Sequence, residues 1–229
     1  MDMITQLSES LQPYKDITAS VASAVTLAQL LTPILLLNDI RKAKTTGEFS
    51  IVPFLGGGVL SVLFVQFGQI IGDGTTVKVN LAGFLLSALY IVVFYIYTPA
   101  KDKFAVWGKI GVAGAFSAAI IAYSVYEDPE HVEQRFGLIL TGILYLLIGF
   151  PMVGLKDVIR TQSTESLPFP LIFMGFVVSF AWLVYGLILN SMFMILQNLI
   201  AVLLTGFQLS FFLIYPSKPK AKDIKKKKN

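Results

Sequence analysis

The chain has 229 residues, of which 55 % are hydrophobic and only 14 % are charged; its formal net charge is +4 and its mean hydropathy is +0.72. A soluble domain of this length could not bury so much apolar side chain, so the composition excludes an ordinary soluble protein and predicts a membrane protein. The chain has no cysteine, which excludes a disulfide framework and a thiolate metal or redox site.

Residues 1–16 are polar and mildly acidic, and we expect them to form a short lead-in at the membrane surface. The first uncharged run, 17–37, is long enough to span a bilayer, which argues against a cleavable signal peptide. About twenty apolar residues cross the hydrocarbon core as a helix, so the long run 166–215 must turn once, at 189–191. We therefore predict an all-α membrane protein with seven transmembrane helices, drawn from the uncharged runs 17–37, 49–72, 79–100, 110–126, 136–155 and 166–215.

The basic residues orient these helices. The loops 38–48, 101–109 and 156–165 and the C-terminal tail carry fifteen of the eighteen Lys and Arg residues. The other side has only Lys15, Lys78 and Arg135, and it collects the acidic residues Glu127, Asp128, Glu130 and Glu133. The positive-inside rule then places the C-terminus in the cytosol and the N-terminus outside or in a lumen. The single histidine, His131, lies in the acidic loop, where we expect a solvated surface role rather than a pH sensor or ligand.

The chain contains an internal repeat with an offset of 118 residues. Matching residues are Pro33 and Pro151, Asp39 and Asp157, Thr46 and Thr164, Phe67-Gly68 and Tyr185-Gly186, Asn80-Leu81 and Asn198-Leu199, and Tyr97 and Tyr215. Each copy holds three predicted helices, and the run 110–126, rich in Gly, Ala and Ser, has no partner under this offset. We predict two parallel three-helix bundles joined by a linker helix (3+1+3). The domains are then a lead-in (1–16), a first repeat (17–100), a linker segment (101–135), a second repeat (136–215) and a basic tail (216–229).

The uncharged runs contain no carboxylate, histidine or lysine, so we expect no catalytic residue, no metal site, no cofactor and no proton coupling through a buried carboxylate. Neutral amides remain. Asn80 and Asn198 are related by the repeat, and two carboxamides facing one cavity would offer donors and acceptors without charge, as sugar hydroxyls require. The alternative is that they hold helices together. Trp182, matched by Phe64 in the first repeat, offers an aromatic face to a pyranose, or is a packing or interfacial tryptophan.

Four prolines form a second group of candidate residues. Pro33 and Pro151 lie late in their predicted helices and favour a kink, whereas Pro53 and Pro168 lie at the start of the following helices. Together they could form a hinge layer at a cytosolic gate, although Pro53 and Pro168 are also typical of an ordinary first helical turn. The tail lysines 225–228 indicate topogenic or lipid-facing charge, with no nucleic-acid partner.

Several motifs resemble the SWEET (MtN3/saliva) family of facilitative sugar transporters. They are Lys44 through Ser50 followed by Pro53-Phe54, Gln162 through Phe169, Trp182 through Gly186, and Asn198. The resemblance implies a seven-helix uniporter that moves mono- or disaccharides by alternating access, often as a homo-oligomer, in the plasma membrane or a Golgi or vesicular membrane. It also implies a proline tetrad at Pro33, Pro53, Pro151 and Pro168, and sugar contacts from Asn80, Asn198 and Trp182.

The chain departs from the family pattern at two places. It reads Gln66-Phe67-Gly68 where the family commonly has Trp-Tyr-Gly, and its short Gly72-Asp73-Gly74 loop is similar to that of animal members. Gln29, one helical turn before Pro33, is a candidate specificity residue. The alternatives are a PQ-loop-type transporter of another small solute such as an amino acid, a seven-helix receptor and a non-transporting membrane scaffold.

Overall fold

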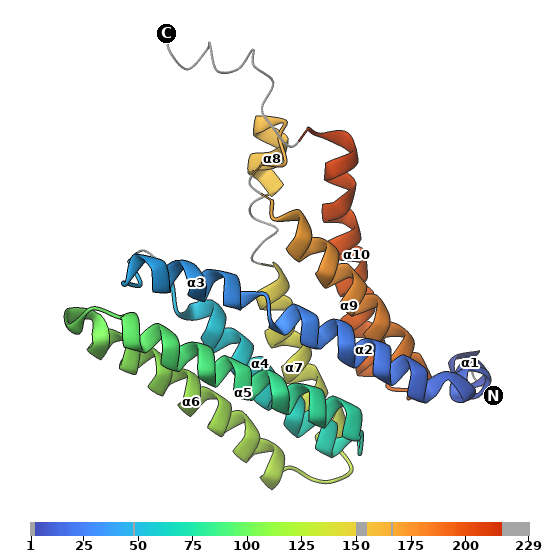
Figure 1. Ribbon diagram of the computed structural model, residues 1–229. Coiled ribbons are helices and arrows are strands. Elements are labelled where there is room, and N and C mark those ends of the chain that lie inside the picture. Colours follow the sequence, from blue (N-terminus) through green and yellow to red (C-terminus); the bar gives the residue numbers. More distant parts are fainter. Residues whose placement is uncertain (1–2, 48, 150–154, 166, 217–229) are drawn as a thin grey trace. The chain divides into compact units, whose positions relative to one another are not determined.

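The computed structural model describes residues 3–47, 49–149, 155–165 and 167–216, and every regular element in these ranges is a helix (Figure 1). The predicted all-α class is therefore confirmed for the described chain. The helices are α1 (Met3–Leu11), η1 (Gln12–Tyr14), α2 (Lys15–Leu30), α3 (Pro33–Ala43), α4 (Val52–Ile70), α5 (Gly74–Tyr97), η2 (Ala100–Asp102), α6 (Lys103–Tyr126), α7 (Val132–Gly149), α8 (Leu155–Thr161), α9 (Phe169–Ile188) and α10 (Met192–Ile214).

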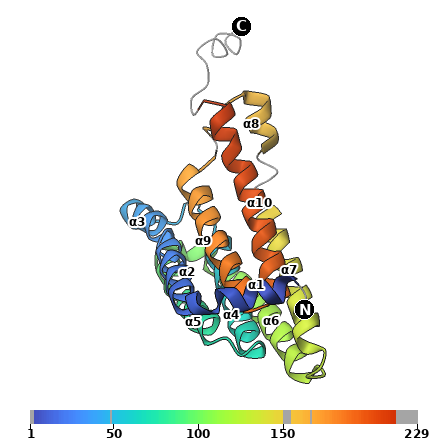
Figure 2. The same ribbon diagram turned by 90° about the vertical axis from the view of Figure 1, so that its right-hand side faces the viewer.

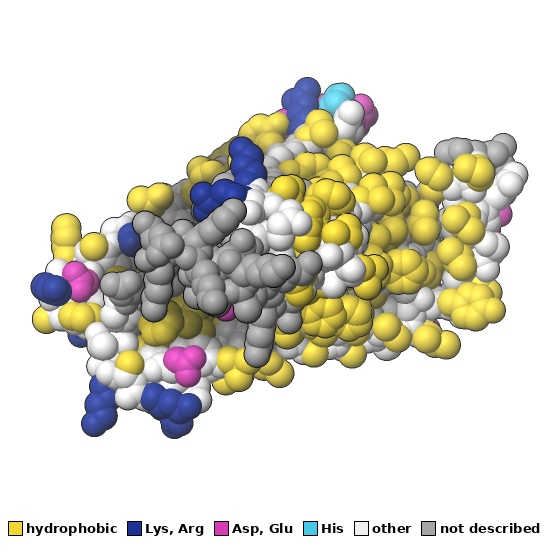
Figure 3. All heavy atoms as spheres, turned by 90° about the horizontal axis from the view of Figure 1, so that it is seen from above, with side chains coloured by type: hydrophobic (Ala, Val, Ile, Leu, Met, Phe, Trp, Pro, Cys, Tyr) yellow, Lys and Arg dark blue, Asp and Glu magenta, His cyan; other side chains and the backbone are white. Residues whose placement is uncertain are grey.

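Six helical segments of the described chain are long and apolar enough to cross a membrane. They are Met3–Ala43, Val52–Ile70, Gly74–Tyr97, Ala100–Tyr126, Phe169–Ile188 and Met192–Ile214. They correspond to six of the seven predicted spans. The remaining predicted span, 136–155, begins within α7, and its residues 150–154 lie outside the described part of the chain. On the face shown in Figure 3, hydrophobic side chains cover wide areas and the charged side chains lie in a few separate groups, as expected for a surface in contact with lipid.

Two of the helices, α5 and α6, begin well before the uncharged runs predict. α5 starts at Gly74 rather than at residue 79 and includes Lys78, while α6 starts at Lys103 rather than at residue 110 and includes Lys109. Hydropathy locates the part of a helix at membrane depth, whereas the helix itself continues to its cap. For α5 the cap is Asp73, whose Oδ2 accepts a hydrogen bond from the Thr76 amide at 2.8 Å.

The N-terminal lead-in is helical, which the sequence analysis did not predict. α1 packs against α9, where Ser8 Oγ and Gln12 Nε2 both donate to the Ile188 carbonyl oxygen at 2.9 and 2.7 Å. The last carbonyls of an α-helix have no partner within the helix and need donors from elsewhere. The two N-terminal side chains supply them at the end of α9.

The chain forms two compact units, residues 26–141 and residues 1–25 with 142–229. In the first unit α4 and α5 form a tight hairpin, α3 packs on α5, and α6 packs on α4. The end that carries the basic loops holds an apolar core, in which the Phe54 ring lies 6.0 Å from the Tyr90 ring and 5.9 Å from the Phe94 ring. The buried members of this core are Leu37, Ile40, Ile51, Phe54, Tyr90, Phe94 and Val106.

In the second unit α9 and α10 run side by side as a second hairpin (Figures 1 and 2). Leu155 and Val158 of α8 pack against Phe211 near the end of α10. The loop after α8 is tied to the end of α10, because the Thr164 amide donates to the Pro216 carbonyl at 3.0 Å. In the first unit the loop after α3 is tied to α5 in the same way, by the Thr46 amide and the Tyr97 carbonyl at 3.2 Å.

The backbone repeats itself at the offset found in the sequence. Lys44 and Gln162, 118 residues apart, both have left-handed φ values, of 55° and 53°, directly after α3 and α8. Gly72 and Asn190, again 118 residues apart, have φ values of 68° and 53° in the turns of the two hairpins. Because left-handed residues other than glycine are uncommon, the match of Lys44 with Gln162, together with the matched turns at Gly72 and Asn190, shows that the two sequence copies repeat the same local geometry. The repeat boundaries 17–100, 101–135 and 136–215 stay a prediction. The compact units described above are defined by contacts rather than by sequence repetition, so their limits do not test these boundaries.

Candidate functional site

Asn80 and Asn198 occupy equivalent positions and have equivalent hydrogen bonds. The Nδ2 atom of Asn80 donates to the Thr76 carbonyl at 2.9 Å, and that of Asn198 donates to the Met194 carbonyl at 2.8 Å. A backbone carbonyl can only accept, so the amide nitrogen must face it and Oδ1 points elsewhere. Both side chains are half-buried. Each asparagine thus satisfies its amide nitrogen within its own helix and keeps an oxygen for a hydroxyl donor.

The hydrogen bonds given above lie within one helix turn and do not join two helices. The helix-to-helix role and the sugar-contact role of the two asparagines both stay predictions. An amide at membrane depth costs several kcal/mol, in order-of-magnitude terms, unless it is paired. The bond to the preceding turn lowers this cost without engaging a second helix. Asn80 belongs to one compact unit and Asn198 to the other, and a shared cavity for both stays a prediction.

A tight helix crossing sets the position of each asparagine. A Cβ atom added to Gly68 would lie 2.9 Å from Val77 Cγ2 and 3.0 Å from the Val77 nitrogen. At Gly186, 118 residues later, it would lie 2.9 Å from Met194 Cβ and 3.2 Å from a backbone nitrogen. Glycine at both places lets the paired helices approach closely just before the asparagine. The depth of each carboxamide is therefore fixed relative to the adjacent turn.

The two hairpins differ at the N-cap residue that directly precedes each asparagine helix. Asp73 Oδ2 accepts from the Thr76 hydroxyl at 2.6 Å in addition to the Thr76 amide, so Thr76 connects the cap to Asn80. The counterpart of Asp73 is Ser191, whose buried hydroxyl has no hydrogen-bond partner among the described residues. α5 is thus held by a stronger cap than α10. Neither Asp73 nor Thr76 was singled out as a site residue in the sequence, although an acidic residue before a helix is a recognised cap signal.

The candidate aromatic residues differ in exposure. Trp182 on α9 is only 8 % exposed and packs edge to face on Tyr185, with ring centroids 5.7 Å apart. Phe64 on α4 is half-buried. The structure thus keeps a ring at both positions but encloses the indole. Its role as a sugar contact stays a prediction.

The predicted kink at Pro33 is present as a break between α2 and α3. α2 ends at Leu30 and α3 begins at Pro33. Proline lacks the amide that would donate to the Gln29 carbonyl, and the Thr32 amide takes that carbonyl at 3.0 Å instead. The Ile34 amide likewise donates to the Leu31 carbonyl at 3.0 Å, three residues back rather than four. Gln29 lies in the last turn before this break and its side chain is half-buried.

The other prolines lie at helix starts or outside the described residues. Pro53 is the second residue of α4, where its missing amide costs nothing, and Pro168 directly precedes α9. Both are exposed. The first-turn interpretation is confirmed for Pro53. Pro151 lies outside the described residues.

Comparison with known proteins shows the family. The MtN3_slv family, described as "Sugar efflux transporter for intercellular exchange", matches residues 17–102 and matches again at residues 134–220. The two matched segments cover more than half of the chain, one in each predicted repeat. The chain belongs to the SWEET (MtN3/saliva) family. The similarity proposed from the loop and proline motifs is thereby confirmed.

Relatives from different kingdoms carry the SWEET name. The Drosophila pseudoobscura pseudoobscura sugar transporter SWEET1 is 30 % identical over 207 residues, which are 88 % of this chain and 89 % of that protein. The Arabidopsis thaliana bidirectional sugar transporter SWEET3 is 28 % identical over 86 % of this chain and 78 % of its own length. A solved structure of a eukaryotic SWEET transporter superposes with a TM-score of 0.80 at 25 % identity, covering 88 % of this chain and 96 % of the other.

Tyr90 contacts the break at Pro33, and the sequence analysis of this SWEET family member did not single it out. Its hydroxyl donates to the Leu30 carbonyl at 2.8 Å, and its side chain is 4 % exposed. In an unbroken helix the Ile34 amide would take that carbonyl, but the Pro33 break has redirected it. Tyr90 therefore satisfies a carbonyl that the proline releases. No local pattern signals this bond, because its two residues are 60 positions apart.

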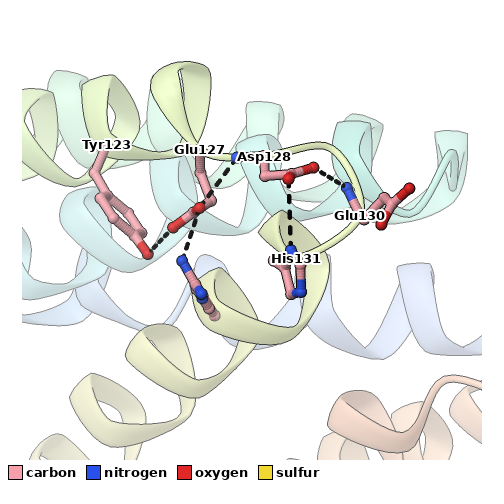
Figure 4. Close-up of polar contacts among 6 residues, drawn as sticks. Tyr123, Glu127, Asp128, Glu130 and His131 are labelled. Carbon is pink, nitrogen blue, oxygen red and sulfur yellow. Dashed lines mark hydrogen bonds and ion pairs between the residues drawn. The ribbon is translucent and has the colours of Figure 1, made fainter.

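The loop between α6 and α7 carries a compact polar cluster (Figure 4). Glu127 accepts a hydrogen bond from the Tyr123 hydroxyl and pairs with Arg135 at 2.9 Å, and these partners lower the Glu127 pKa to about 2. His131 lies 3.7 Å from Asp128, with both side chains about half exposed. The structure thus places His131 on the surface, as expected, and an ion pair beside it that stays charged across the physiological pH range.

Proposed function

We propose that this chain is a facilitative transporter that moves mono- or disaccharides across a membrane by alternating access. Membership of a family of sugar transporters supports the proposal. The observation that carries it is the pair Asn80 and Asn198, each holding its amide nitrogen in its own helix and keeping its oxygen for a ligand. Neutral acceptors suit hydroxyl donors and offer no charge for a charged solute.

We also propose seven spans in the 3+1+3 arrangement, with the repeats at 17–100 and 136–215. The recurrence of backbone geometry at the 118-residue offset supports parallel repeats. The excess of basic residues in three loops and the tail supports a cytosolic C-terminus and an outer or lumenal N-terminus. A homo-oligomeric state and a plasma-membrane or Golgi location are proposed on the family resemblance alone.

In this proposal Pro33, Pro53, Pro151 and Pro168 flank the cytosolic gate, and Gln29, Phe64 and Trp182 line the sugar path. The break at Pro33 supports a hinge, because backbone bonds there have already left the regular helical pattern. Gln29 directly precedes this hinge. Its side chain would therefore change position with the gate.

The test is uptake of labelled glucose, trehalose and sucrose into liposomes, with and without a proton gradient. We expect saturable flux of a sugar that does not depend on the proton gradient, and loss of at least tenfold in rate for Asn80→Ala and for Asn198→Ala. Each substitution removes one hydrogen bond to the sugar, which is stronger in the transport-competent complex and contributes about 1.4 kcal/mol. A loss of that size corresponds to a tenfold lower transport rate. Gln69→Ala is a matched control, because it removes an exposed amide from the neighbouring helix α4.

The outcome decides between the proposed cargo and its alternatives. Normal sugar flux in both asparagine variants would refute the site while leaving sugar transport intact. If a folded sample moves no sugar but moves a neutral amino acid, the other small-solute transporter is correct. Equal losses in Gln69→Ala would show that amide removal disturbs folding rather than binding.

A further inference from the structure

An apolar groove lies between α4 and α6 in the 26–141 unit. It has a volume of about 510 Å³ and is lined by Val52 and Leu55 of α4 and by six residues of α6 between Ala105 and Phe116. Lys109 is the one charged residue of this lining. Gly108 helps to form the hollow, because a Cβ added there would meet no atom within 4 Å. The groove thus has a hydrocarbon-like wall and a single cationic group.

The length of the groove fits one leaflet of a bilayer. Ala105 and Phe116 are eleven residues apart on one helix, which at 1.5 Å per residue gives about 16 Å. Half of a hydrocarbon core about 30 Å thick is about 15 Å. An acyl chain of the leaflet could therefore lie along the groove from the interface toward the bilayer centre.

Aromatic and basic residues mark the interface at the Ala105 end. Trp107 Nε1 donates to the Tyr95 hydroxyl at 3.0 Å, and the Lys103 ammonium lies 4.9 Å from the centre of the Tyr95 ring. Paired Trp and Tyr side chains with lysines are typical of the headgroup level. The segment 101–109 holds Lys101, Lys103 and Lys109 and a single carboxylate, Asp102, so this level is net positive.

We propose that this groove binds an anionic phospholipid, with an acyl chain along α4 and α6 and the phosphate at Lys109. Lysine binds phosphate as a point charge. A second copy of the chain is a poorer occupant, because a two-fold contact across this face would bring two Lys109 side chains together in an apolar interface. In the proposed orientation this end of α6 faces the cytosolic leaflet, where anionic lipids are concentrated.

The test uses the full chain in phosphatidylcholine vesicles that contain a small fraction of photoreactive phosphatidylserine or photoreactive phosphatidylcholine, each with the reactive group in the acyl chain. Crosslinks to residues 105–116 are quantified by mass spectrometry. Because both leaflets have the same composition, the result does not depend on the proposed orientation or on transport. The variants are Lys109→Gln, Lys109→Arg and Gly108→Leu, with Lys78→Gln as a control that removes an exposed lysine from the start of α5.

We expect phosphatidylserine to crosslink about fivefold more than phosphatidylcholine, since one lysine near an anionic headgroup contributes about 1 kcal/mol and 1.4 kcal/mol is tenfold. Lys109→Gln should remove this preference, whereas Lys109→Arg and Lys78→Gln should keep it. Gly108→Leu, whose Cβ would meet no atom within 4 Å and whose side chain would project into the groove, should lower crosslinking by both lipids. An unchanged preference for phosphatidylserine in Lys109→Gln would overturn the proposal. A Gly108→Leu variant that alters the oligomeric mass but leaves the crosslinks unchanged would also overturn it, in favour of a second copy of the chain.

Discussion

Replacing Tyr90 by phenylalanine removes one hydroxyl and keeps the ring. The ring packs in the core beside Phe54, and the hydroxyl donates to the Leu30 carbonyl at 2.8 Å. That carbonyl is free of its regular helical partner because the Ile34 amide binds Leu31 instead. Tyr90→Phe therefore leaves an acceptor without a protein donor beside the helix break.

The expected cost follows from two limits. Double-mutant cycles on side-chain hydrogen bonds between membrane helices give about 0.6 kcal/mol on average and up to about 1.7 kcal/mol, and model peptides give about 1–2 kcal/mol. A buried acceptor left unpaired costs about 1–3 kcal/mol. Because Tyr90 is almost fully covered and water has little access to the carbonyl, we expect Tyr90→Phe to lower the free energy of unfolding by about 1–2 kcal/mol.

A second substitution separates this explanation from a simple packing effect. Pro33→Ala restores an amide to residue 33, so the regular pattern can reform and the Ile34 amide can return to the Leu30 carbonyl. In that background Tyr90→Phe should cost about 0.5 kcal/mol or less, because the carbonyl has a new donor. The double-mutant cycle then gives a coupling energy of about 1 kcal/mol between residues 33 and 90.

The four proteins would be unfolded in mixed detergent micelles by titration with sodium dodecyl sulfate. Tyr97→Phe is the control, since no hydrogen bond of the Tyr97 hydroxyl is found in the described chain, and it should be neutral. If Tyr90→Phe costs as much in the Pro33→Ala background as in the wild type, the link between the tyrosine and the helix break is wrong. If it costs nothing in either background, the hydroxyl does not compensate for the break at all.

Three further predictions concern the hairpins and the outer loop. Asp73→Ala should lower the melting temperature through the loss of about 1 kcal/mol of helix capping. Ser191→Ala should leave it unchanged, because the Ser191 hydroxyl has no hydrogen-bond partner in the described chain, and equal shifts would contradict the difference between the hairpins. Gly186→Ala should destabilise by about 1–2 kcal/mol in the same melting assay, because the new methyl group overpacks against α10, whereas Gly114→Ala in open surroundings should not. The Glu127 pKa is lowered from its usual 4.5 to about 2, so the stabilising contribution of the ionised carboxylate is complete above about pH 4.5 and is lost only as the pH falls toward 2. The difference in unfolding free energy between wild type and Glu127→Gln should therefore be the same at about pH 7 and at about pH 5. A smaller difference at the lower pH would count against the ion pair.

Features that depend on local chemistry were predictable from the sequence. The break before Pro33 follows from a missing amide, and the position of Pro53 in the first turn of α4 follows from the same cause. Hydropathy located the six described spans, since bilayer thickness sets the length of an apolar run. The matched turns at Gly72 and Asn190 follow from the repeat.

Features that depend on contacts between distant residues were not predictable. The bond from Tyr90 to Leu30 has no sequence signal, because any tyrosine in an apolar helix has the same local pattern. The helical form of residues 3–11 was missed although Ile4, Leu7 and Leu11 recur at helical spacing, whereas their docking on α9 is a tertiary effect. The hydrogen bonds of Asn80 and Asn198 follow from side-chain rotamers rather than from residue spacing.

The docking of α1 on α9 means that the order of the chain differs from the order of packing. Residues 1–25, which include the start of the proposed first repeat (17–100), group with residues 142–229, and Ser8 and Gln12 cap a helix of the proposed second repeat. If the chain were expressed as two polypeptides divided in the loop at 127–131, the donors for Ile188 would lie on the first and their acceptor on the second. Assembly of the two pieces would then be needed to complete a single helix end.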